Sequence, residues 1–460
     1  MELTIGNELY IQDPSPELLQ WARQNLVFEN PEYINRKRRG FWTGNTDQYL
    51  SLYRVMSGVL VLPCGVGKHI RKYLSGCKIR TDLADGGMKE YRGKIPLYEY
   101  QEAAVEAMER SGCGILQSPC GSGKTQMGIA LAAQIGRKAL WVTHTKDLLE
   151  QSYGRAVQYF GGSGMGKITG GKVEVGNLMT FATVQTLSKI DLPVYKYEWD
   201  VIIVDECHRV AGTPASVTMF YRVMSSLAAR YKYGLSATVH RSDGLIRTTF
   251  AILGDVAYKV PDEAVSEKTM QVSVMKRDTG IQTAPECLDT DGTMDYAKLI
   301  PYLVGNRCRN EKIIKDLADN RDHSNLILSD RLEHLKLLRS MMPTDLKDMS
   351  VMIDGKMTSK KAKEERSMAI EDMRQGKKRY LFASYSLAKE GLAIPCLDRL
   401  YLTTPRKDYS VITQSIGRIA RTAPGKDSAV CYDYVDDIGF CENQYRKRKT
   451  SYRKAGCKFL

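Results

Sequence analysis

Eight consecutive residues, Ser118-Pro-Cys-Gly-Ser-Gly-Lys-Thr125, have the types and spacing of a loop that binds phosphate groups. Glycine lets backbone N–H groups close around phosphate oxygens, and a helix that starts at the loop adds partial positive charge. In this pattern Lys124 reaches the β- and γ-phosphates of a nucleoside triphosphate, and the hydroxyl of Thr125 holds Mg²⁺. The pattern usually opens with glycine, where this chain has Ser118. The residues predicted to bind the cofactor are Ser118, Gly121, Ser122, Gly123, Lys124 and Thr125.

Two other stretches, 62–69 and 161–168, imitate this loop. They end in His69 and Ile168, and neither side chain supplies the hydroxyl that holds magnesium. We predict a turn beside a strand at both places.

Two adjacent carboxylates supply the partner that a phosphate loop requires. Asp205 and Glu206 directly follow the apolar run Val201–Val204. Phosphoryl transfer depends mainly on positioning and charge neutralisation, so a cation, a lysine and a group that orients water are the essential parts. We predict that Thr125 and Asp205 hold Mg²⁺, the latter through water, and that Glu206 orients and deprotonates the attacking water.

A third candidate lies far along the chain, in Gln414-Ser-Ile-Gly-Arg-Ile-Ala-Arg421. Arg418 and Arg421 are three positions apart, so they lie on one face of a helix. An arginine presented to the γ-phosphate from another domain stabilises the charge of the transition state. Read alone, two arginines on a helix are usually a solvated face. The predicted catalytic residues are Lys124, Asp205, Glu206, Gln414, Arg418 and Arg421.

The elements that position these residues alternate between short apolar strands and amphipathic helices. This alternation predicts an α/β fold with mainly parallel sheets covered on both faces, and catalytic loops at the carboxyl ends of the strands. The predicted strands are 140–142, 179–183, 200–204, 325–328, 379–383 and 398–402, and helices are predicted over 146–152 and 332–338. We expect three domains: a small α+β unit over 1–90 and two α/β units over 91–262 and 263–460. The stretch 276–300 has little periodicity, and the sequence leaves open whether it is a linker or an insertion.

The first 90 residues contain a helix predicted at 16–23 and a strand at 59–62. Aromatic side chains interleave there with the basic run Arg36–Arg39, a mixture suited to phosphate contacts and base stacking. The same aromatics could form a small core, and the sequence favours neither interpretation. The aromatic residues are Tyr33, Phe41, Trp42 and Tyr49.

The charge of the chain points to nucleic acid as a partner. The 460 residues carry a net charge of +14, with a second basic cluster at the C-terminal end. Nucleic acid is the leading partner for so basic a protein, with charge kept for solubility as the alternative. The C-terminal cluster comprises Arg446, Lys447, Arg448, Lys449, Arg453, Lys454 and Lys458, and we favour a grip on DNA over a solvated tail.

The cysteines and the hydrophobic pattern bear on the compartment. Eleven cysteines, an odd number without a CxxC pair, fit a reduced compartment better than disulfides or zinc. The N-terminus lacks a signal-peptide pattern and no apolar run reaches the roughly 18–20 residues of a membrane span. We expect a cytoplasmic protein without a membrane partner.

Seven stretches occur in the order of the motifs of superfamily-two helicases, and the chain resembles that family over about residues 95–435. They are 97–101, GSGKT, 143–145, 183–187, DECH at 205–208, 235–238 and 414–421. The stretches 239–244, 354–355 and 388–395 are similar to the UvsW-type phage branch-migration helicases, which are related to the XPB and RecG groups.

The resemblance implies two RecA-like parallel-sheet domains in tandem behind the small N-terminal domain, with ATP and Mg²⁺ as cofactors. It implies that Gln101 reads adenine, that Tyr98 stacks on it in place of the common arginine, and that Gly391 belongs to the nucleotide site. His208, Ser236 and Thr238 would couple hydrolysis to movement. The implied backbone contacts to nucleic acid are Thr145, Thr183, Arg241, Asp330, Arg331 and Ser384.

This chain departs from the pattern at three further positions. Ala393 stands where many relatives have aspartate, which weakens any expected ribose contact there. Ser384 replaces the common threonine, and His240 replaces a proline.

The resemblance implies an ATP-dependent DNA helicase that remodels forks and Holliday junctions in replication, recombination or repair. Its expected polarity is 3′ to 5′, and its expected location is the cytoplasm of a phage-infected cell. Two alternatives remain: an RNA helicase, and a DNA translocase subunit of a nuclease complex that does not separate strands.

Overall fold

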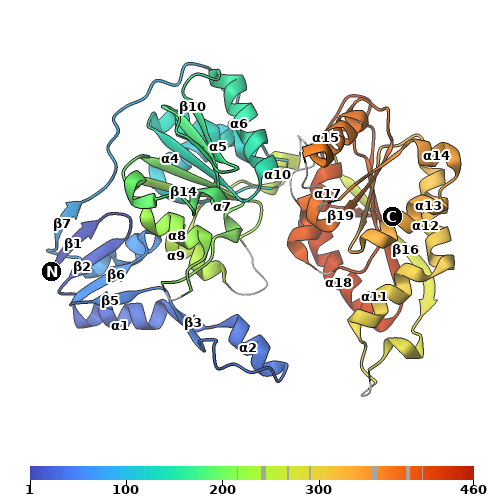
Figure 1. Cartoon of the computed structure of the whole chain (residues 1–460), viewed down its shortest axis with the longest axis horizontal. Helices are drawn as coiled ribbons and strands as arrows, with labels where there is room; N and C mark the ends of the chain where they lie inside the picture. Colours follow the sequence, from blue (N-terminus) through green and yellow to red (C-terminus); the bar gives the residue numbers. More distant parts are fainter. Residues whose placement is uncertain are drawn as a thin grey trace. The chain divides into compact units, whose positions relative to one another are not determined.

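The computed structural model of the chain describes residues 1–119, 121–214, 216–239, 245–266, 269–289, 292–354, 360–389, 394–406 and 408–460. They divide into two compact units, Met1–Pro261 and Asp262–Leu460. The first unit contains a small mixed sheet and a large, almost wholly parallel sheet, and the second contains a parallel sheet (Figure 1). This is the α/β fold with two parallel-sheet lobes that the sequence predicted.

The small sheet belongs to the N-terminal part of the first unit, with strand order β5-β6-β2-β1-β7. Its strands are β1 (Glu2–Ile5), β2 (Leu9–Gln12), β5 (Arg54–Met56), β6 (Val59–Leu62) and β7 (Lys78–Thr81). Helix α1 (Pro16–Asn25) starts as predicted, because the hydroxyl of Ser15 accepts a hydrogen bond from the N–H of Leu18 and Pro16 suits the first turn. Leu18 and Ala22 of this helix are fully buried in the small core.

A projecting arm, residues 27–51, leaves this small domain between α1 and β5. It consists of β3 (Val27–Glu29), helix α2 (Pro31–Arg38) and β4 (Tyr49–Ser51), which pairs antiparallel with β3. Figure 1 shows α2 beyond the body of the first unit, and none of its side chains is buried. The β3–β4 hairpin anchors the arm through Phe28, which packs against the small core, and the buried Leu50, whereas α2 itself has no buried side chain.

The larger sheet of the first unit, which we call lobe 1, has the order β11-β10-β12-β9-β13-β14-β8-β15. All neighbours pair parallel except β10 and β11. Its strands are β8 (Cys113–Gln117), β9 (Ala139–Thr143), β10 (Met165–Thr169), β11 (Lys172–Glu174), β12 (Met179–Thr183), β13 (Val201–Asp205), β14 (Tyr231–Ser236) and β15 (Val256–Lys259). The main helices are α4 (Glu99–Ser111), α5 (Lys124–Ile135), α6 (Lys146–Phe160), α7 (Val184–Leu187), α8 (Met219–Ser226) and α9 (Ile246–Leu253). Central strands such as β13 are buried along their whole length because helices cover both faces.

The small domain is fastened to lobe 1 through its loops. The buried ammonium of Lys232 on β14 donates to the carbonyl oxygens of Asn7 and Met224, 3.0 Å from each. The imitation loop at 62–69 becomes a 3₁₀ turn (Cys64–Val66) and helix α3 (Gly67–Ile70) after β6. A Cβ at Gly65 would lie 2.4 Å from the carbonyl oxygen of Phe250, so this turn touches the backbone of α9 directly.

The second unit, lobe 2, has the all-parallel order β18-β19-β17-β20-β21-β16-β22. Its strands are β16 (Val272–Gln282), β17 (Asn325–Ser329), β18 (Ser350–Ile353), β19 (Tyr380–Ser384), β20 (Arg399–Leu402), β21 (Ala429–Asp437) and β22 (Lys458–Phe459). Its helices include α10 (Asp262–Ser266), α11 (Tyr296–Gly305), α12 (Arg307–Asp319), α13 (Leu332–Met341), α14 (Thr344–Asp348), α15 (Lys360–Arg374), α16 (Tyr385–Lys389), α17 (Tyr409–Ile419) and α18 (Gly439–Lys454). Leu326 and Leu328 on β17 enter one core and Ile327 the other, as the two-residue period of a strand requires.

The stretch 276–300, which the sequence could not assign as a linker or an insertion, belongs to lobe 2. Its first residues continue β16, which pairs with β21, and its last residues begin α11. The strand was missed because polar side chains interrupt its apolar pattern. One of them, Arg277, forms an ion pair with Asp316 of α12 and is thereby accommodated at the sheet.

Candidate active site

The phosphate loop joins β8 to α5 at the carboxyl edge of lobe 1. Ser118 and Ser122 are buried, their hydroxyls hydrogen-bond each other, and Ser122 Oγ also donates to the carbonyl of Pro119 at 2.7 Å. Gly121 and Gly123 have φ of +89° and +82°, a conformation that residues with a side chain rarely adopt. The serine at the first position thus closes the loop on itself, and the glycines provide its curvature.

The end of α5 that faces this loop is suited to an anion. Gly123 is the N-cap and supplies no side-chain hydrogen bond, so no capping side chain occupies the first-turn N–H groups. Lys124 Nζ lies 3.4 Å from the carbonyl oxygens of Ser118 and Pro119, above the same loop. Thr125 follows in the first turn and is half-buried. N–H groups, an ammonium and a hydroxyl together form a donor set for phosphate oxygens.

The carboxylate pair lies at the end of β13 in the same sheet. Asp205 is buried, its Oδ1 accepts a hydrogen bond from the N–H of Glu206 at 3.0 Å, and Glu206 has a φ of +50°. Burial and then the charge of Glu206 raise the pKa of Asp205. Burial acts in the same direction on Glu206, but the hydrogen bond from His208 and the charge of Lys124 hold the pKa of Glu206 below its ordinary value. Glu206 is therefore ionised at neutral pH, and Lys124 is near enough to influence both carboxylates.

His208 connects this pair to the neighbouring strand. Its Nδ1 lies 3.3 Å from Glu206 Oε2 and 3.0 Å from Ser236 Oγ at the end of β14. The Ser236 hydroxyl donates to the carbonyl of Thr238 at 2.6 Å and accepts from the N–H of Thr238 at 3.2 Å. Because that hydroxyl hydrogen is used, Nδ1 of His208 is the donor. The carbonyl of Ser236 in turn accepts from the N–H of Ser118, 3.0 Å away, so one chain of contacts joins the three predicted motifs.

The residues that fit magnesium are few. Among the described residues there is no group of three or more His, Cys, Asp or Glu side chains able to hold a metal ion by themselves. Magnesium is commonly held by one or two protein oxygens together with phosphate oxygens and waters. Thr125, in the first turn of α5 after β8, and Asp205, the last residue of β13, fit that requirement.

The predicted adenine-reading residues lie beside the loop. Gln101 is buried at the start of α4, where its Oε1 accepts from the N–H of Tyr98 at 3.0 Å and its Nε2 donates to the carbonyl of Ser122 at 2.8 Å. Tyr98 is 52% exposed and stacks on Tyr100. The sequence reasoning missed Tyr100, whose hydroxyl also donates to Ser122 O at 3.1 Å; its only signal was its place next to Gln101. The contacts of Gln101 tie α4 to the phosphate loop, and its role toward adenine stays a prediction.

The predicted arginines lie at the end of α17 in lobe 2. Gln414 is buried, while Arg418 and Arg421 are half-buried. The prediction that both arginines lie on one face of a helix is wrong, because α17 ends at Ile419 and leaves Arg421 two residues beyond it. The backbone of Arg421 forms a β-bridge with Thr269.

The predicted nucleic-acid contacts follow strands in both lobes. In lobe 1, Thr145 is the N-cap of α6 and Thr183 is buried at the end of β12. In lobe 2, Arg331 is exposed and Ser384 half-buried after β17 and at the end of β19. Asp330 is mostly buried and forms an ion pair with Arg406, so its carboxylate has an internal partner. Arg241 and Gly391 lie outside the described residues.

The sequence left open whether the aromatic residues of the N-terminal domain form a small core, and their exposure in the arm decides this. Phe41, Trp42 and Tyr49 are 60%, 68% and 55% exposed, so they do not form a core, whereas Tyr33 on α2 is half-buried. A cavity of about 670 Å³ separates α2 from lobe 1. Its lining includes Arg36, Arg39 and Phe41 of the arm and Thr213, Ser216 and Thr248 of lobe 1. Cationic and aromatic side chains of the arm thus line one side of this cleft, and hydroxyl groups of lobe 1 line the other.

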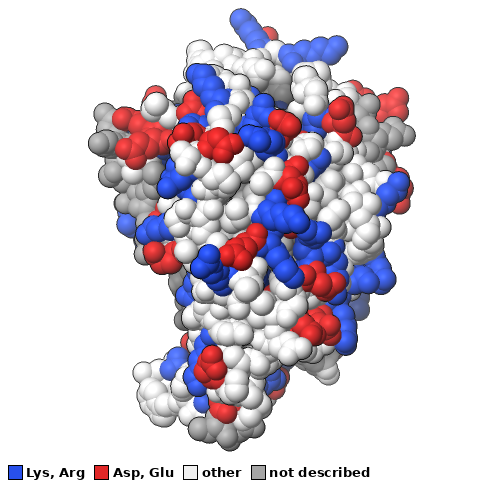
Figure 2. All heavy atoms as spheres, turned by 90° about the vertical axis from the view of Figure 1, so that its right-hand side faces the viewer, with Lys and Arg blue, Asp and Glu red and all other residues white. Residues whose placement is uncertain are grey.

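The C-terminal basic cluster is only partly at the surface. Arg448 is buried and forms a two-pronged ion pair with Asp433 of β21, at 2.8 Å, and Tyr452 is buried beside it. The prediction that the whole cluster grips DNA is wrong for Arg448, whereas Arg446, Lys447 and Arg453 are exposed. Over the face shown in Figure 2, basic and acidic side chains are interspersed, so the net charge does not form a single-sign field there. Of the described helices, none has the length and apolar content to cross a membrane.

Comparison with known proteins agrees with this division into lobes. Residues 94–241 match the family described as "Type III restriction enzyme, res subunit", and residues 308–423 match the "Helicase conserved C-terminal domain". A putative ATP-dependent RNA helicase of Acanthamoeba polyphaga mimivirus is 25% identical over 88% of this chain and 82% of its own length. A probable helicase of Escherichia phage T5 is 25% identical over 80% of this chain and 75% of its own length. A DNA 3′-5′ helicase XPB of Kineococcus radiotolerans is 29% identical over 50% of this chain and 38% of its own length.

A solved structure at low sequence identity shows the same fold. Dbp5 of S. cerevisiae bound to RNA and ADP BeF3 matches 80% of this chain and 94% of its own with a TM-score of 0.54 at 15% identity. T4 UvsW covers 100% of this chain and 99% of its own at 19% identity, with a TM-score of 0.42.

Proposed function

The chain is an ATP-dependent superfamily-two helicase, and we propose that it acts on DNA and remodels branched substrates, namely forks and four-way junctions, by branch migration. The observation that carries the proposal is the chain of contacts Glu206–His208–Ser236–Ser118, which connects the hydrolytic carboxylates to the phosphate loop. The choice of branched DNA rests on the resemblance of the stretches at 239–244, 354–355 and 388–395 to UvsW-type helicases. We propose cytoplasmic action, in replication, recombination or repair.

In the nucleotide site each residue has a distinct task. Lys124 and the uncapped start of α5 bind the β- and γ-phosphates, and Glu206 orients the attacking water and accepts its proton. Thr125 and Asp205 would hold Mg²⁺, which neutralises phosphate charge when bound. Gln414 and Arg418 on α17, and Arg421 two residues after its end, stabilise the charge that develops at the γ-phosphate. Tyr98, Gln101 and Gly391 complete the nucleotide site.

Coupling to movement follows the His208 contacts. A change at Glu206 moves His208, which is hydrogen-bonded to Ser236, and Ser236 holds the turn at Thr238. Nucleic acid is gripped along its backbone by Thr145, Thr183 and Arg241 in lobe 1 and by Asp330, Arg331 and Ser384 in lobe 2. Backbone contacts make the binding independent of sequence and sensitive to salt.

The arm supplies the contacts of the N-terminal domain to nucleic acid. Its basic helix α2 suits phosphates, and the exposed rings of Phe41 and Trp42 suit base stacking. A helix without a buried face obtains little stabilisation from the rest of the protein, which favours a role in contacting a partner.

Two other functions each have one observation in their favour. The mimivirus relative is described as an RNA helicase, which favours RNA as substrate. The match of 94–241 to a restriction-enzyme subunit favours a translocase that works with a nuclease and separates no strands.

The test is ATP-dependent processing of a mobile four-way DNA junction, a tailed DNA duplex and an RNA duplex by the purified chain. Glu206→Gln should keep ATP binding and lower turnover by at least about 100-fold, because it removes the proton acceptor. Glu198→Gln is the matched control, since Glu198 precedes the same strand β13 at its other end and pairs with Lys138.

Resolution of the junction that is lost with Glu206→Gln and kept with Glu198→Gln would support the proposal. Unwinding of RNA alone would refute the choice of DNA. ATP hydrolysis stimulated by DNA, with no strand product from any substrate, would favour the translocase.

A further inference from the structure

The end of α17 is followed by a tight turn that returns the chain to the helix. The N–H of Lys426 donates to the carbonyl of Ala423 at 3.2 Å, and Gly425 between them has a φ of +73°. Proline at the second position and glycine with positive φ at the third, as in Ala423-Pro-Gly-Lys426, are typical of a type II turn. The turn brings the Lys426 side chain back to the residues that it has just left.

Lys426 holds the backbone next to the predicted arginines. Its Nζ donates to the carbonyl oxygens of Ile419 and Arg421, at 2.6 Å in both cases. The carbonyl between them, that of Ala420, accepts from the N–H of Met270 at 2.7 Å. Three successive carbonyl groups at the end of a helix are therefore fixed, two of them by one ammonium, and a cation is favourable at this end.

We propose that Lys426 is a positioning residue for ATP hydrolysis, which fixes the backbone at 419–421 so that Arg418 and Arg421 are presented to the γ-phosphate. This inference rests on the proposed role of the two arginines. Lys426 acts through them and has no contact with the nucleotide assigned to it. A displacement of about 1 Å at such groups is enough to lower a rate substantially.

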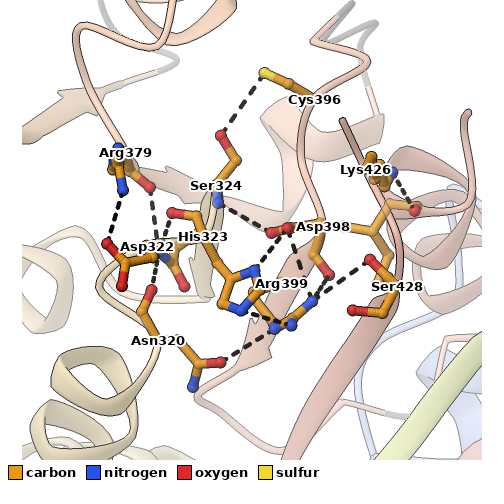
Figure 3. A network of polar contacts seen from close by, with 12 residues as sticks. Asn320, Asp322, His323, Ser324, Arg379, Cys396, Asp398, Arg399, Lys426 and Ser428 are labelled. Carbon is orange, nitrogen blue, oxygen red and sulfur yellow. Dashed lines mark hydrogen bonds and ion pairs between the residues drawn. The ribbon is translucent and has the colours of Figure 1, made fainter. Parts of the chain in front are cut away.

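The groups around Lys426 make this role dependent on pH. Figure 3 shows Lys426 in one view with Cys396, Asp398 and Arg399. Burial lowers the pKa of Lys426 to about 8, against the opposing charge of Asp398; Cys396, Arg421 and Arg399 also face it. Asp398 is itself engaged by His323 Nδ1 at 2.8 Å and by the N–H of Ser324 at 2.9 Å. As the pH rises through about 8, the ammonium loses its charge and one donor, and the end of α17 is held less firmly.

The test is steady-state ATP hydrolysis by the full chain with saturating DNA. Lys426→Met should lower kcat about 10- to 100-fold, the cost of misplacing groups that act in the transition state. KM for ATP should change by less than about threefold, because the phosphate loop is intact. The wild type should lose kcat above pH 8, whereas Lys426→Arg, which stays charged, should regain part of the rate and keep it to higher pH.

The matched control is Lys312→Met in the same lobe. Lys312 also donates to two carbonyl oxygens, those of Thr279 at 2.6 Å and Asp278 at 3.5 Å, but away from α17. Loss of kcat in both lysine variants alike would overturn the inference, as would full additivity of Lys426→Met with Arg421→Ala. If Arg421→Ala itself left kcat unchanged, the proposed role of the arginine would fail instead.

Discussion

Ser236 offers the sharpest test of the coupling proposed here. Replacing it by alanine removes a fully buried hydroxyl that has three partners: His208 Nδ1 at 3.0 Å, the carbonyl of Thr238 at 2.6 Å and the N–H of Thr238 at 3.2 Å. His208 then loses its contact with Ser236 and keeps its contact with Glu206 at 3.3 Å. Asp205 and Glu206 stay in place, but their connection to β14 through His208 is lost.

The magnitude follows from the value of one buried hydrogen bond. Such a bond contributes about 1 kcal/mol, and leaving its partner unsatisfied costs about 1–3 kcal/mol. We therefore expect ATP hydrolysis without DNA to stay within about threefold of wild type, while strands separated per ATP hydrolysed fall about tenfold, the factor that corresponds to 1.4 kcal/mol. The assay measures phosphate release and strand separation in one reaction.

Thr180→Val is the matched control for this experiment. Thr180 is also fully buried in lobe 1, and its Oγ1 accepts hydrogen bonds from the N–H of Gly176 at 3.0 Å and from Trp199 Nε1 at 3.1 Å. It lies near the start of β12, far along that strand from the catalytic edge. Both variants should lose similar stability, yet only Ser236→Ala should lose coupling. An unchanged ratio of strands to ATP in Ser236→Ala, or an equal loss in Thr180→Val, would refute the reasoning.

Three further predictions test other parts of the molecule. Lys124→Met should weaken ATP binding and lower hydrolysis at least about 100-fold, because one phosphate-binding cation is lost, and binding of a fluorescent ATP analogue will check it. Trp42→Ala should weaken binding of single-stranded DNA by about 1–3 kcal/mol with an unchanged salt dependence, whereas Arg39→Ala should reduce the salt slope by about 1 if that side chain contacts a phosphate. Equal effects of both changes at every salt concentration would contradict the stacking role. Gly65→Ala should destabilise the first unit by at least about 1–3 kcal/mol, since its Cβ would lie 2.4 Å from Phe250 O, and thermal unfolding will measure this loss against Gly67→Ala, whose Cβ has room.

The sequence predicted the parts of the site that depend on local order. Lys124 lies in a glycine-rich turn after one strand, and Glu206 follows another strand. Because the carboxyl ends of parallel strands meet at one edge of the sheet, this local order predicts that both residues lie at that edge. The contacts that connect these motifs, such as that of His208 with Ser236, arise from the order of strands in the sheet. Spacing along the chain carries no information about strand order, so the pairing of β13 with β14 came only from the structure.

Partners from distant segments account for what the sequence did not show. Arg448 is part of a basic run, yet Asp433 of β21 makes it a buried residue. Arg277 interrupts an apolar pattern, yet its pairing with Asp316 accompanies a continuous strand β16. Phe41 and Trp42 are residue types that commonly form a core. They are exposed because the arm projects from the small domain. In each case the side chain follows the chemistry of a neighbour far away in sequence.

The fastening of the small domain to lobe 1 has a mechanical consequence. Lys232 donates a hydrogen bond to the carbonyl of Asn7, and Asn7 Nδ2 donates one to the carbonyl of Ser225. Asp82 forms an ion pair with Lys196, and the backbone at Gly65 packs directly against α9. These contacts hold the base of the arm and the sheet that carries the phosphate loop together as one body. A force applied to the base of the arm would therefore pass through these contacts into the sheet that carries the phosphate loop.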